Sequence, residues 1–142
     1  MNSIEIKNIT SLKQLYQNCS LYQELYHDIT LQELKQNLSW MFNNKIKFVI
    51  AKAKEEPVAI CAYWLGIRLN SGKFLQIDSL IVNPKYRGKK IAVDLLNYVE
   101  NIAREEKVKF YILDSYTDNH KALKLYIKHD FKIKGFHLMK LL

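Results

Sequence analysis

The decisive stretch of this chain reads Ile77-Asp78-Ser79-Leu80-Ile81-Val82-Asn83-Pro84-Lys85-Tyr86-Arg87-Gly88-Lys89-Lys90-Ile91-Ala92. Its apolar first part predicts the end of a strand over residues 74–82. Pro84 ends this strand, and Gly88 allows the chain to turn tightly. From Ile91 onward apolar residues recur at helical spacing, which predicts a helix. A strand, a turn and a helix in direct succession predict an α/β domain, in which ligands bind at the carboxyl end of the strand.

The turn between this strand and this helix is strongly basic. Lys85, Arg87, Lys89 and Lys90 lie there without one acid, and the whole chain has a net charge of +8. The first backbone N–H groups of a helix lack internal partners, and the helix dipole adds positive charge. The turn therefore predicts a phosphate site in which Arg87 chelates oxygens and the lysines act as point charges. A solvated basic loop is the alternative.

The spacing of the glycines excludes two other phosphate-binding classes. Neither a Walker loop nor a dinucleotide fingerprint is present, so the sequence does not support a nucleotide triphosphatase or a nicotinamide dehydrogenase.

Strands and helices are also predicted on both sides of this stretch. Capping boxes at Ser11 and Thr30 predict the starts of two helices, and Asp118 or Asn119 caps a last helix that runs to His129. The predicted strands cover residues 4–9, 47–53, 58–69, 74–82, 109–113 and 131–142. This order predicts a single mixed α/β domain over residues 1–142, with a parallel central strand–helix–strand unit.

Length and composition exclude several classes of protein. The chain has 142 residues, 49% hydrophobic and 25% charged, which is typical of one globular domain. Its longest apolar run, residues 57–67, is about half of what a bilayer span needs. Glu5 and Lys7 stand where a signal peptide would be apolar. We therefore expect a cytoplasmic protein with no membrane partner, in which Cys19 and Cys61 are reduced. The four histidines show no ligand spacing, so no metal is expected.

The basic turn resembles the acetyl-CoA motif of the GNAT superfamily of N-acetyltransferases. That motif consists of Arg or Gln, two residues, Gly, one residue, and Gly or Ala. Here Arg87 opens it and Ala92 closes it, but Lys90 stands where the central Gly is expected. If this position needs a positive φ, lysine costs about 1 kcal/mol relative to glycine.

A second segment resembles the strand–helix part of the superfamily that closes over the pantetheine arm. The matching residues are Leu113, Asp114, Ser115, Asn119, Ala122, Tyr126 and Phe131. Asp130 replaces the usual Gly before Phe131. The order of predicted elements matches the superfamily over nearly the whole chain. The resemblance implies a central, mostly antiparallel twisted sheet with one parallel strand–helix–strand unit and helices on both faces.

The resemblance further implies that acetyl-CoA is the acetyl donor. Asn119 either caps its helix or bonds the pantetheine arm, and Tyr126 matches a position from which a tyrosine reaches the sulfur. The backbone amides of residues 80–82 would stabilise the oxyanion on the thioester carbonyl. The expected cofactor-binding residues are Leu80, Ile81, Val82, Arg87, Gly88, Lys89, Lys90, Ile91, Ala92 and Asn119.

Asp78 is the candidate general base, acting directly or through water. An alkyl amine is almost fully protonated at pH 7, so a group must accept its proton. Asp78 interrupts an apolar strand, strand alternation places it on the face of Leu80 and Val82, and burial there would raise its pKa. An aspartate tied to a backbone amide or to a lysine is the alternative, and Asp114 is a rival base.

These residues predict an N-acetyltransferase that moves an acetyl group from acetyl-CoA to a primary amine of a small molecule or protein. Direct transfer within a ternary complex is expected, because neither cysteine is placed next to a base. Tyr22, Tyr26 and Trp40 lie in the helices that would wall the acceptor site. The positive net charge disfavours a polycationic acceptor unless acids gather at the acceptor mouth.

The alternative function is a basic module on the same fold that binds nucleic acid. Such a module would be either catalytically inactive or would acylate a charged RNA, and its RNA binding would depend steeply on salt. Many members of the superfamily pair as homodimers, but no residue pattern in this chain specifies an interface.

Overall fold

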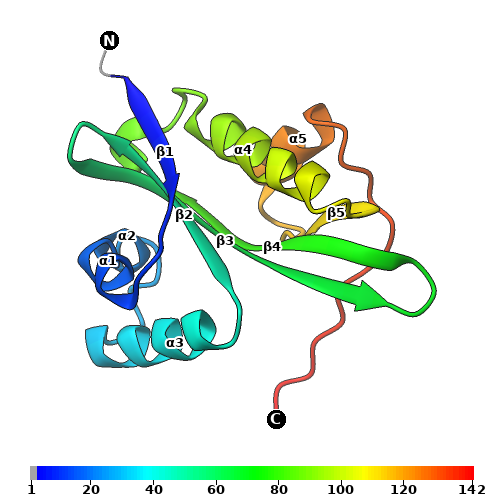
Figure 1. Ribbon diagram of the computed structural model, residues 1–142, viewed down its shortest axis with the longest axis horizontal. Helices are drawn as coiled ribbons and strands as arrows, with labels where there is room; N and C mark the ends of the chain where they lie inside the picture. Colours follow the sequence, from blue (N-terminus) through cyan, green and yellow to red (C-terminus); the bar gives the residue numbers. More distant parts are fainter. Residues whose placement is uncertain (1–2) are drawn as a thin grey trace.

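A computed structural model describes residues 3–142 (Figure 1). In chain order its elements are β1 (Ile4–Asn8), α1 (Leu12–Gln17), α2 (Ser20–Gln23), α3 (Leu31–Asn43), β2 (Lys47–Ala53), β3 (Glu56–Arg68), β4 (Gly72–Val82), the short 3₁₀ helix η1 (Pro84–Tyr86), α4 (Ile91–Glu105), β5 (Phe110–Leu113) and α5 (His120–Lys128). The strands form one sheet in the order β1-β2-β3-β4-β5. Only β4 and β5 are parallel, so the expected mostly antiparallel sheet with one parallel unit is confirmed.

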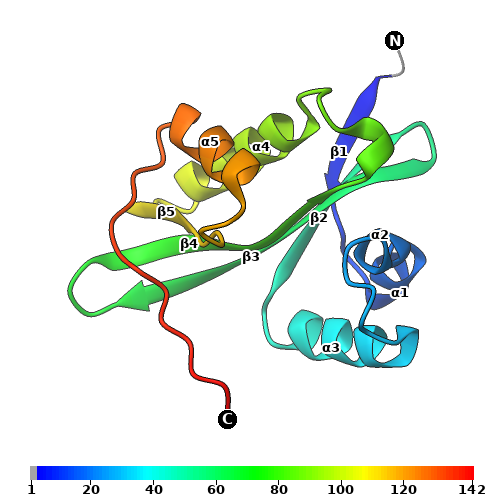
Figure 2. The ribbon, with the colours of Figure 1, turned by 180° about the vertical axis from the view of Figure 1, so that it is seen from behind.

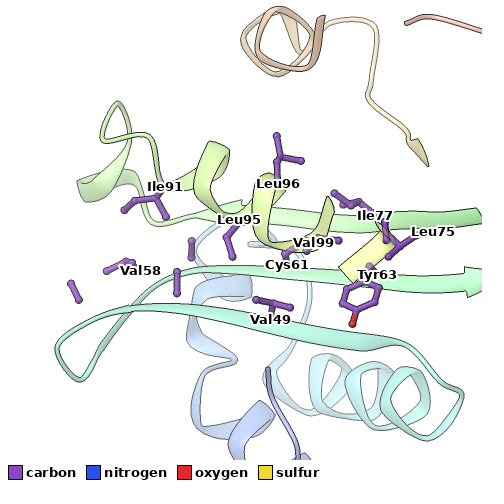
Figure 3. Packing of buried hydrophobic residues seen from close by; sticks show 14 residues of the cluster. Val49, Val58, Cys61, Tyr63, Leu75, Ile77, Ile91, Leu95, Leu96 and Val99 are labelled. Carbon is purple, nitrogen blue, oxygen red and sulfur yellow. The ribbon is translucent and has the colours of Figure 1, made fainter. Parts of the chain in front are cut away.

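Helices cover both faces of the sheet, as expected. In Figures 1 and 2, α4 and α5 lie on one face and α1–α3 on the other. The buried residues form two clusters, one on each face. The cluster under α4 includes Val49, Cys61, Leu75, Leu95 and Val99 (Figure 3). The cluster under α1–α3 includes Leu15, Leu34, Leu38, Phe48 and Ile50.

Three helices begin at the capping residues that the sequence predicts. The side chains of Ser11 and Thr30 each accept a hydrogen bond from the backbone N–H three residues further on, at 3.2 and 3.1 Å. At the start of α5, Asn119 rather than Asp118 is the cap, because its Oδ1 accepts a hydrogen bond from the backbone N–H of Ala122 at 3.3 Å. Each cap satisfies a backbone donor that the helix leaves without an internal partner.

The ladder between β3 and β4 shifts register in the middle of the sheet. Tyr63 pairs with Ile77, but the preceding residue Ala62 pairs with Ser79, so Asp78 is an extra residue in β4. An extra residue of this kind is a β-bulge, which bends the strand and leaves the extra residue unpaired.

The bulge reverses the alternation of side chains along β4. Leu75 and Ile77 belong to the cluster under α4, and beyond the bulge Leu80 and Val82 pack against that same cluster. The prediction that alternation puts Asp78 on the face of Leu80 and Val82 therefore does not hold, because the extra residue interrupts the alternation between them.

The predicted strand over residues 131–142 is not formed, although the structure describes all of them. Phe131 packs back onto the domain, with its ring centroid 5.1 Å from that of Tyr111 and 6.0 Å from that of Tyr126. Residues 132–142 are exposed and belong to no helix or strand. Because no further strand pairs with β5, the predicted closing strand is wrong and β5 remains an edge of the sheet.

Both cysteines, Cys19 and Cys61, are buried and form no disulfide. Among residues 3–142, no helix is both long enough and apolar enough to span a bilayer. The same residues contain no group of three His, Cys, Asp or Glu side chains that could hold a metal ion.

Candidate active site

The basic turn before α4 takes up the left-handed backbone conformation twice. Gly88 has a φ of 78°, and Lys90 has a φ of 63° with a ψ of 8°. Lys90, which replaces the central glycine of the motif, therefore does occupy a position with positive φ. A lysine in this region costs about 1 kcal/mol relative to glycine. The backbone path of the turn is therefore kept although its central glycine is replaced.

The start of α4 leaves its backbone donors open. Lys90 is the N-cap residue, but its side chain makes no capping hydrogen bond. The first intrahelical bond runs from the N–H of Asp94 to the carbonyl of Lys90, at 3.0 Å. The N–H groups of residues 91–93 precede that bond and point out of the helix end. Together with the helix dipole they form a place where an anion is stabilised.

The cations of the turn are not neutralised by acids. None of the ion pairs formed within residues 3–142 includes Lys85, Arg87, Lys89 or Lys90, and all four side chains are exposed. The Lys89 Nζ lies 4.9 Å from the ring centroid of Tyr86. This local contact leaves the charge of Lys89 available to a phosphate.

β4 extends beyond β5 and has no strand partner there. The parallel pairing ends at Ile77 and Leu113, whereas β4 continues to Val82. The bulge at Asp78 follows directly after the last pair. On the β5 side, the backbone groups of residues 78–82 therefore have no ladder partner. This stretch includes the amides that sequence reasoning assigned to the oxyanion, and it leads straight into the basic turn.

Asp78 lies at the bulge and has no polar partner. None of the side-chain hydrogen bonds and ion pairs within residues 3–142 involves it, which argues against an aspartate tied to a lysine or a backbone amide. Desolvation by the surrounding protein raises the pKa of its carboxyl group above the ordinary value, although the side chain is exposed. The charge of Asp78 in turn helps to raise the pKa of Tyr26, which places α2 and the following loop near the bulge.

The rival base, Asp114, is held by two neighbours. Its Oδ2 accepts a hydrogen bond from the Gln76 amide at 3.2 Å and lies 3.3 Å from Nδ1 of His137. A carboxylate held in this way is less suited than Asp78 to accept a proton from a substrate.

Tyr126 lies on the inner side of α5, facing the sheet. It is partly buried and packs against Phe131, and burial raises the pKa of its phenol. The Cys61 thiol is a further electrostatic cause of this rise, and the Asp78 carboxylate acts on the pKa of Cys61. Burial raises the pKa of Cys61 itself to about 12, so this thiol is not a nucleophile at neutral pH.

A pocket of about 460 Å³ lies between the end of α2 and the first turn of α3. It is lined by Leu25, Tyr26, His27, Asp28, Ile29 and Glu33. Sequence reasoning placed Tyr26 at the acceptor site, but it missed Asp28 and Glu33. In the sequence, Asp28 lies two residues after Tyr26, and Glu33 is the last residue of the capping box that begins at Thr30.

Tyr22, which the sequence placed with Tyr26 in the helices that would wall the acceptor site, is buried. Its ring stacks on that of Tyr26, with centroids 6.5 Å apart. Its hydroxyl is fully buried and lacks a hydrogen-bond partner among the described residues. Ser79, next to the bulge, offsets part of the rise in the Tyr22 pKa that burial causes. Trp40 lies elsewhere, in a pocket of about 540 Å³ formed mainly by α3.

The sequence and the fold match known proteins. Residues 9–131 match the family described as "Acetyltransferase (GNAT) family". Among solved structures, a "possible acetyltransferase" from Clostridium difficile 630 has 22% identity and a TM-score of 0.78, with 98% of this chain and 97% of that chain covered. A GNAT family acetyltransferase from Staphylococcus aureus has 17% identity and a TM-score of 0.79, with 99% of both chains covered. No curated protein matches the sequence.

An aminoglycoside N-acetyltransferase, AAC(6')-Iy, solved in complex with CoA, is also similar. It has 12% identity and a TM-score of 0.84, with 99% of this chain and 95% of that chain covered. Since the family match covers most of the sequence, the chain belongs to the GNAT family of acetyltransferases, and the expected acyltransferase class is confirmed.

The strain at Lys90 can be measured through stability. Lys90→Gly should raise the free energy of unfolding by about 1 kcal/mol, because glycine adopts positive φ without the Cβ clash. For a chain of this length that is a rise of a few degrees in Tm. Denaturation in urea gives the free energy directly.

Lys89→Gly is the matched control. This substitution also removes one lysine charge from the turn, but Lys89 does not have a positive φ. It should leave stability unchanged or lower it by up to about 1 kcal/mol. Equal changes in the two variants would show that Lys90 is not strained.

Proposed function

We propose that this protein transfers the acetyl group of acetyl-CoA to a primary amine by direct attack within a ternary complex. The observation that supports this most is the continuity of the unpaired edge of β4 with the basic turn and the open start of α4. The unpaired edge of β4 suits a thioester carbonyl, and the basic turn with the start of α4 suits a pyrophosphate. The described residues thus fit both ends of acetyl-CoA.

The basic turn before α4 carries the groups that would bind the pyrophosphate of acetyl-CoA. The amides that follow Lys90 and the exposed side chains of Arg87 and the lysines belong to the same short turn, so a pyrophosphate bound there would receive both directional hydrogen bonds and charge. The cofactor-binding residues of the proposal are those predicted from the sequence: residues 80–82, residues 87–92 and Asn119. Because Asn119 already caps α5 through Oδ1, its amide nitrogen remains available to the pantetheine arm.

The chemical step uses the unpaired edge of β4. The amine nitrogen attacks the thioester carbonyl carbon, the C–N bond forms, and the C–S bond breaks. Backbone N–H groups of residues 80–82 stabilise the negative charge that develops on the carbonyl oxygen. The amine loses its proton to Asp78, directly or through water. The departing thiolate accepts a hydrogen bond from the Tyr126 hydroxyl.

Tyr126 serves better as a hydrogen-bond donor than as a full acid. A phenol of ordinary pKa, about 10, is a weaker acid than a thiol of about 8.5. Burial raises the pKa of Tyr126 further, which makes full proton transfer to the thiolate still less favourable. Stabilisation by a hydrogen bond, followed by protonation from solvent, is therefore the role we assign to it.

The pocket beside Tyr26 indicates the class of acceptor. Asp28 and Glu33 line it, and the unpaired Asp78 is close enough to act on Tyr26. These acids meet the condition under which a strongly basic protein can accept a cationic amine. Carboxylates with an aromatic ring are suited to an ammonium group. The similar structures include aminoglycoside acetyltransferases, one of them in complex with sisomicin, which supports a small cationic amine as acceptor.

The proposed activity requires that acetyl-CoA stabilises the folded protein. At a ligand concentration of about 100 times Kd, binding adds about 2.7 kcal/mol and raises Tm by several degrees. Thermal melting should show this shift with acetyl-CoA and with free CoA, but little shift with ATP. A melting curve that neither CoA species moves would refute the proposal and favour the alternative, a basic module for nucleic acid.

Tyr126→Phe tests the hydrogen bond to the sulfur. We expect kcat to fall about tenfold or more, because the leaving thiolate loses its donor. The KM for acetyl-CoA should change little. Tyr98→Phe removes a hydroxyl from another partly buried tyrosine, on α4, and serves as the control. If both variants keep the same kcat as the unmodified enzyme, Tyr126 has no role in the reaction.

Asp78→Asn tests the base through the pH profile. The unmodified enzyme should gain activity as the pH rises through the Asp78 pKa, which lies above the ordinary carboxyl value, because only the carboxylate accepts a proton. The variant should lose about 10²- to 10⁴-fold in kcat at neutral pH, and less at high pH, where free amine is already present. Asp130→Asn, on the exposed turn after α5, is the control. A loss that is the same at every pH would exclude Asp78 as the base.

A further inference from the structure

The hydroxyl group of Tyr22 is buried without a hydrogen-bond partner. Tyr22 lies on α2 and is 4% exposed, and its hydroxyl oxygen has no partner within residues 3–142. Apart from Cys19, the other buried members of its cluster under α1–α3 are aliphatic or aromatic. A buried hydroxyl in this state destabilises the fold, because it loses its hydrogen bonds to water and gains none. Phenylalanine would fill the same space without that loss, so stability does not account for this hydroxyl.

The side chain of Ser79, next to the bulge, lies on the same face of the sheet as Tyr22. Ser79 pairs with Ala62 on β3, and Ala62 belongs to the cluster under α1–α3 that also contains Tyr22. Ile81, two residues beyond Ser79 on β4, belongs to this cluster too. Residues directly opposite each other in a ladder share a face, and so do residues two apart along a strand. Ser79 is therefore directed at the layer in which the Tyr22 hydroxyl is buried.

The hydroxyl groups of Tyr22 and Ser79 are neighbours. The Ser79 side chain lowers the pKa of Tyr22, against the rise that burial causes, and this requires the two side chains to be close. Ser79 has no hydrogen-bond partner either, because within residues 3–142 the serines whose side chains make hydrogen bonds are Ser11, Ser39 and Ser115. A hydroxyl group can donate one hydrogen bond and accept others, so these two groups are able to satisfy each other.

Ser79 is placed where a hydrogen bond would fix the proposed site. It follows Asp78, the extra residue of the bulge, and precedes residues 80–82, whose amides serve the oxyanion in the proposed reaction. A bulge interrupts the ladder, and this stretch has no strand partner on the β5 side, so fewer backbone bonds hold it in place. The Tyr22 ring in turn stacks on that of Tyr26 with an angle of 12° between the planes, and Tyr26 lines the pocket proposed for the acceptor. Tyr22 therefore connects the acceptor pocket with the bulge.

We propose that Tyr22 is a positioning residue for the acetyl group of acetyl-CoA: when this group is bound, the Tyr22 hydroxyl donates a hydrogen bond to Oγ of Ser79 and holds the bulge in its binding geometry. This inference rests on the proposed function, in which the amides that follow the bulge contact the carbonyl oxygen. Hydrogen bonds at an active site are often long or poorly aligned until the ligand is bound. The chain thus keeps a hydroxyl that destabilises the fold on its own, because the same hydroxyl stabilises the complex.

Tyr22→Phe tests this role, because a structural hydroxyl and a positioning hydroxyl predict different results. The variant should melt at the same temperature as the unmodified protein or a few degrees higher, since an unpartnered buried hydroxyl is removed. Its Kd for acetyl-CoA should nevertheless rise about 3- to 10-fold, which corresponds to the loss of one neutral hydrogen bond. Its Kd for free CoA should stay unchanged, because free CoA has no acetyl carbonyl and the basic turn is intact. Calorimetric titration of the full chain with each compound measures both constants.

Ser79→Ala and a double variant identify the partner of the Tyr22 hydroxyl. Ser79→Ala alone should raise the Kd for acetyl-CoA by the same factor, and combining it with Tyr22→Phe should add nothing, because either change removes the same bond. Tyr16→Phe is the matched control. Tyr16, on α1, packs against the same cluster, and its hydroxyl donates a hydrogen bond to the carbonyl of Lys35 at 3.2 Å. This control should lower the Tm and leave both Kd values unchanged.

The outcomes separate the proposal from a structural role and from the proposed function. A lower Tm of Tyr22→Phe with equal weakening of both compounds would show that the hydroxyl is structural and would overturn the proposal. Additive losses in the double variant would overturn it as well, since Ser79 would then not be the partner. If the unmodified protein binds both compounds and Tyr22→Phe binds them equally well, only this inference fails. If the unmodified protein binds neither compound, the proposed function fails and this inference fails with it.

Discussion

One extra residue in β4 determines how this site is built. Asp78 has to fit between the ladder pairs Tyr63–Ile77 and Ala62–Ser79, so β4 bulges there. Because the pairing with β5 ends at Ile77, the rest of β4 has no strand partner on that side. The end of this pairing leaves backbone donors of β4 without a strand partner, and the bulge places an unpaired carboxylate beside them. In the proposed reaction these two features serve the oxyanion and the amine proton.

The strained turn after β4 provides the site proposed for the phosphates of the acetyl donor. Lys90 occupies a left-handed position that glycine would adopt without strain, and its side chain does not cap α4. A lysine at this point costs some stability but adds a positive charge next to the open helix start. The basic turn and the bulge are joined by residues 79–83, so a long donor molecule can contact both at once. Binding and chemistry are therefore positioned by one continuous stretch of the chain.

Much of this arrangement can be predicted from the sequence, and the parts that cannot have physical reasons. The caps at Ser11 and Thr30, the extent of β2 and the start of α4 follow from local patterns and are found as predicted. The bulge at Asp78 depends on pairing with β3, which no local pattern records, so alternation alone could not assign the face of Asp78. Residues 131–142 are predicted as a strand from their apolar residues, but a strand forms only where the segment pairs with the edge of a sheet.

The proposed reaction requires that the unpaired edge of β4 and the open start of α4 contact the same acetyl donor. The most direct measurement is a titration of the ¹⁵N-labelled protein with acetyl-CoA, followed by amide chemical shifts. The account predicts that the largest changes fall on the amides of residues 80–82 and 88–93, with those of β1 unaffected. Binding that leaves the amides of residues 80–82 unchanged, or that perturbs mainly the pocket on α3, would contradict it.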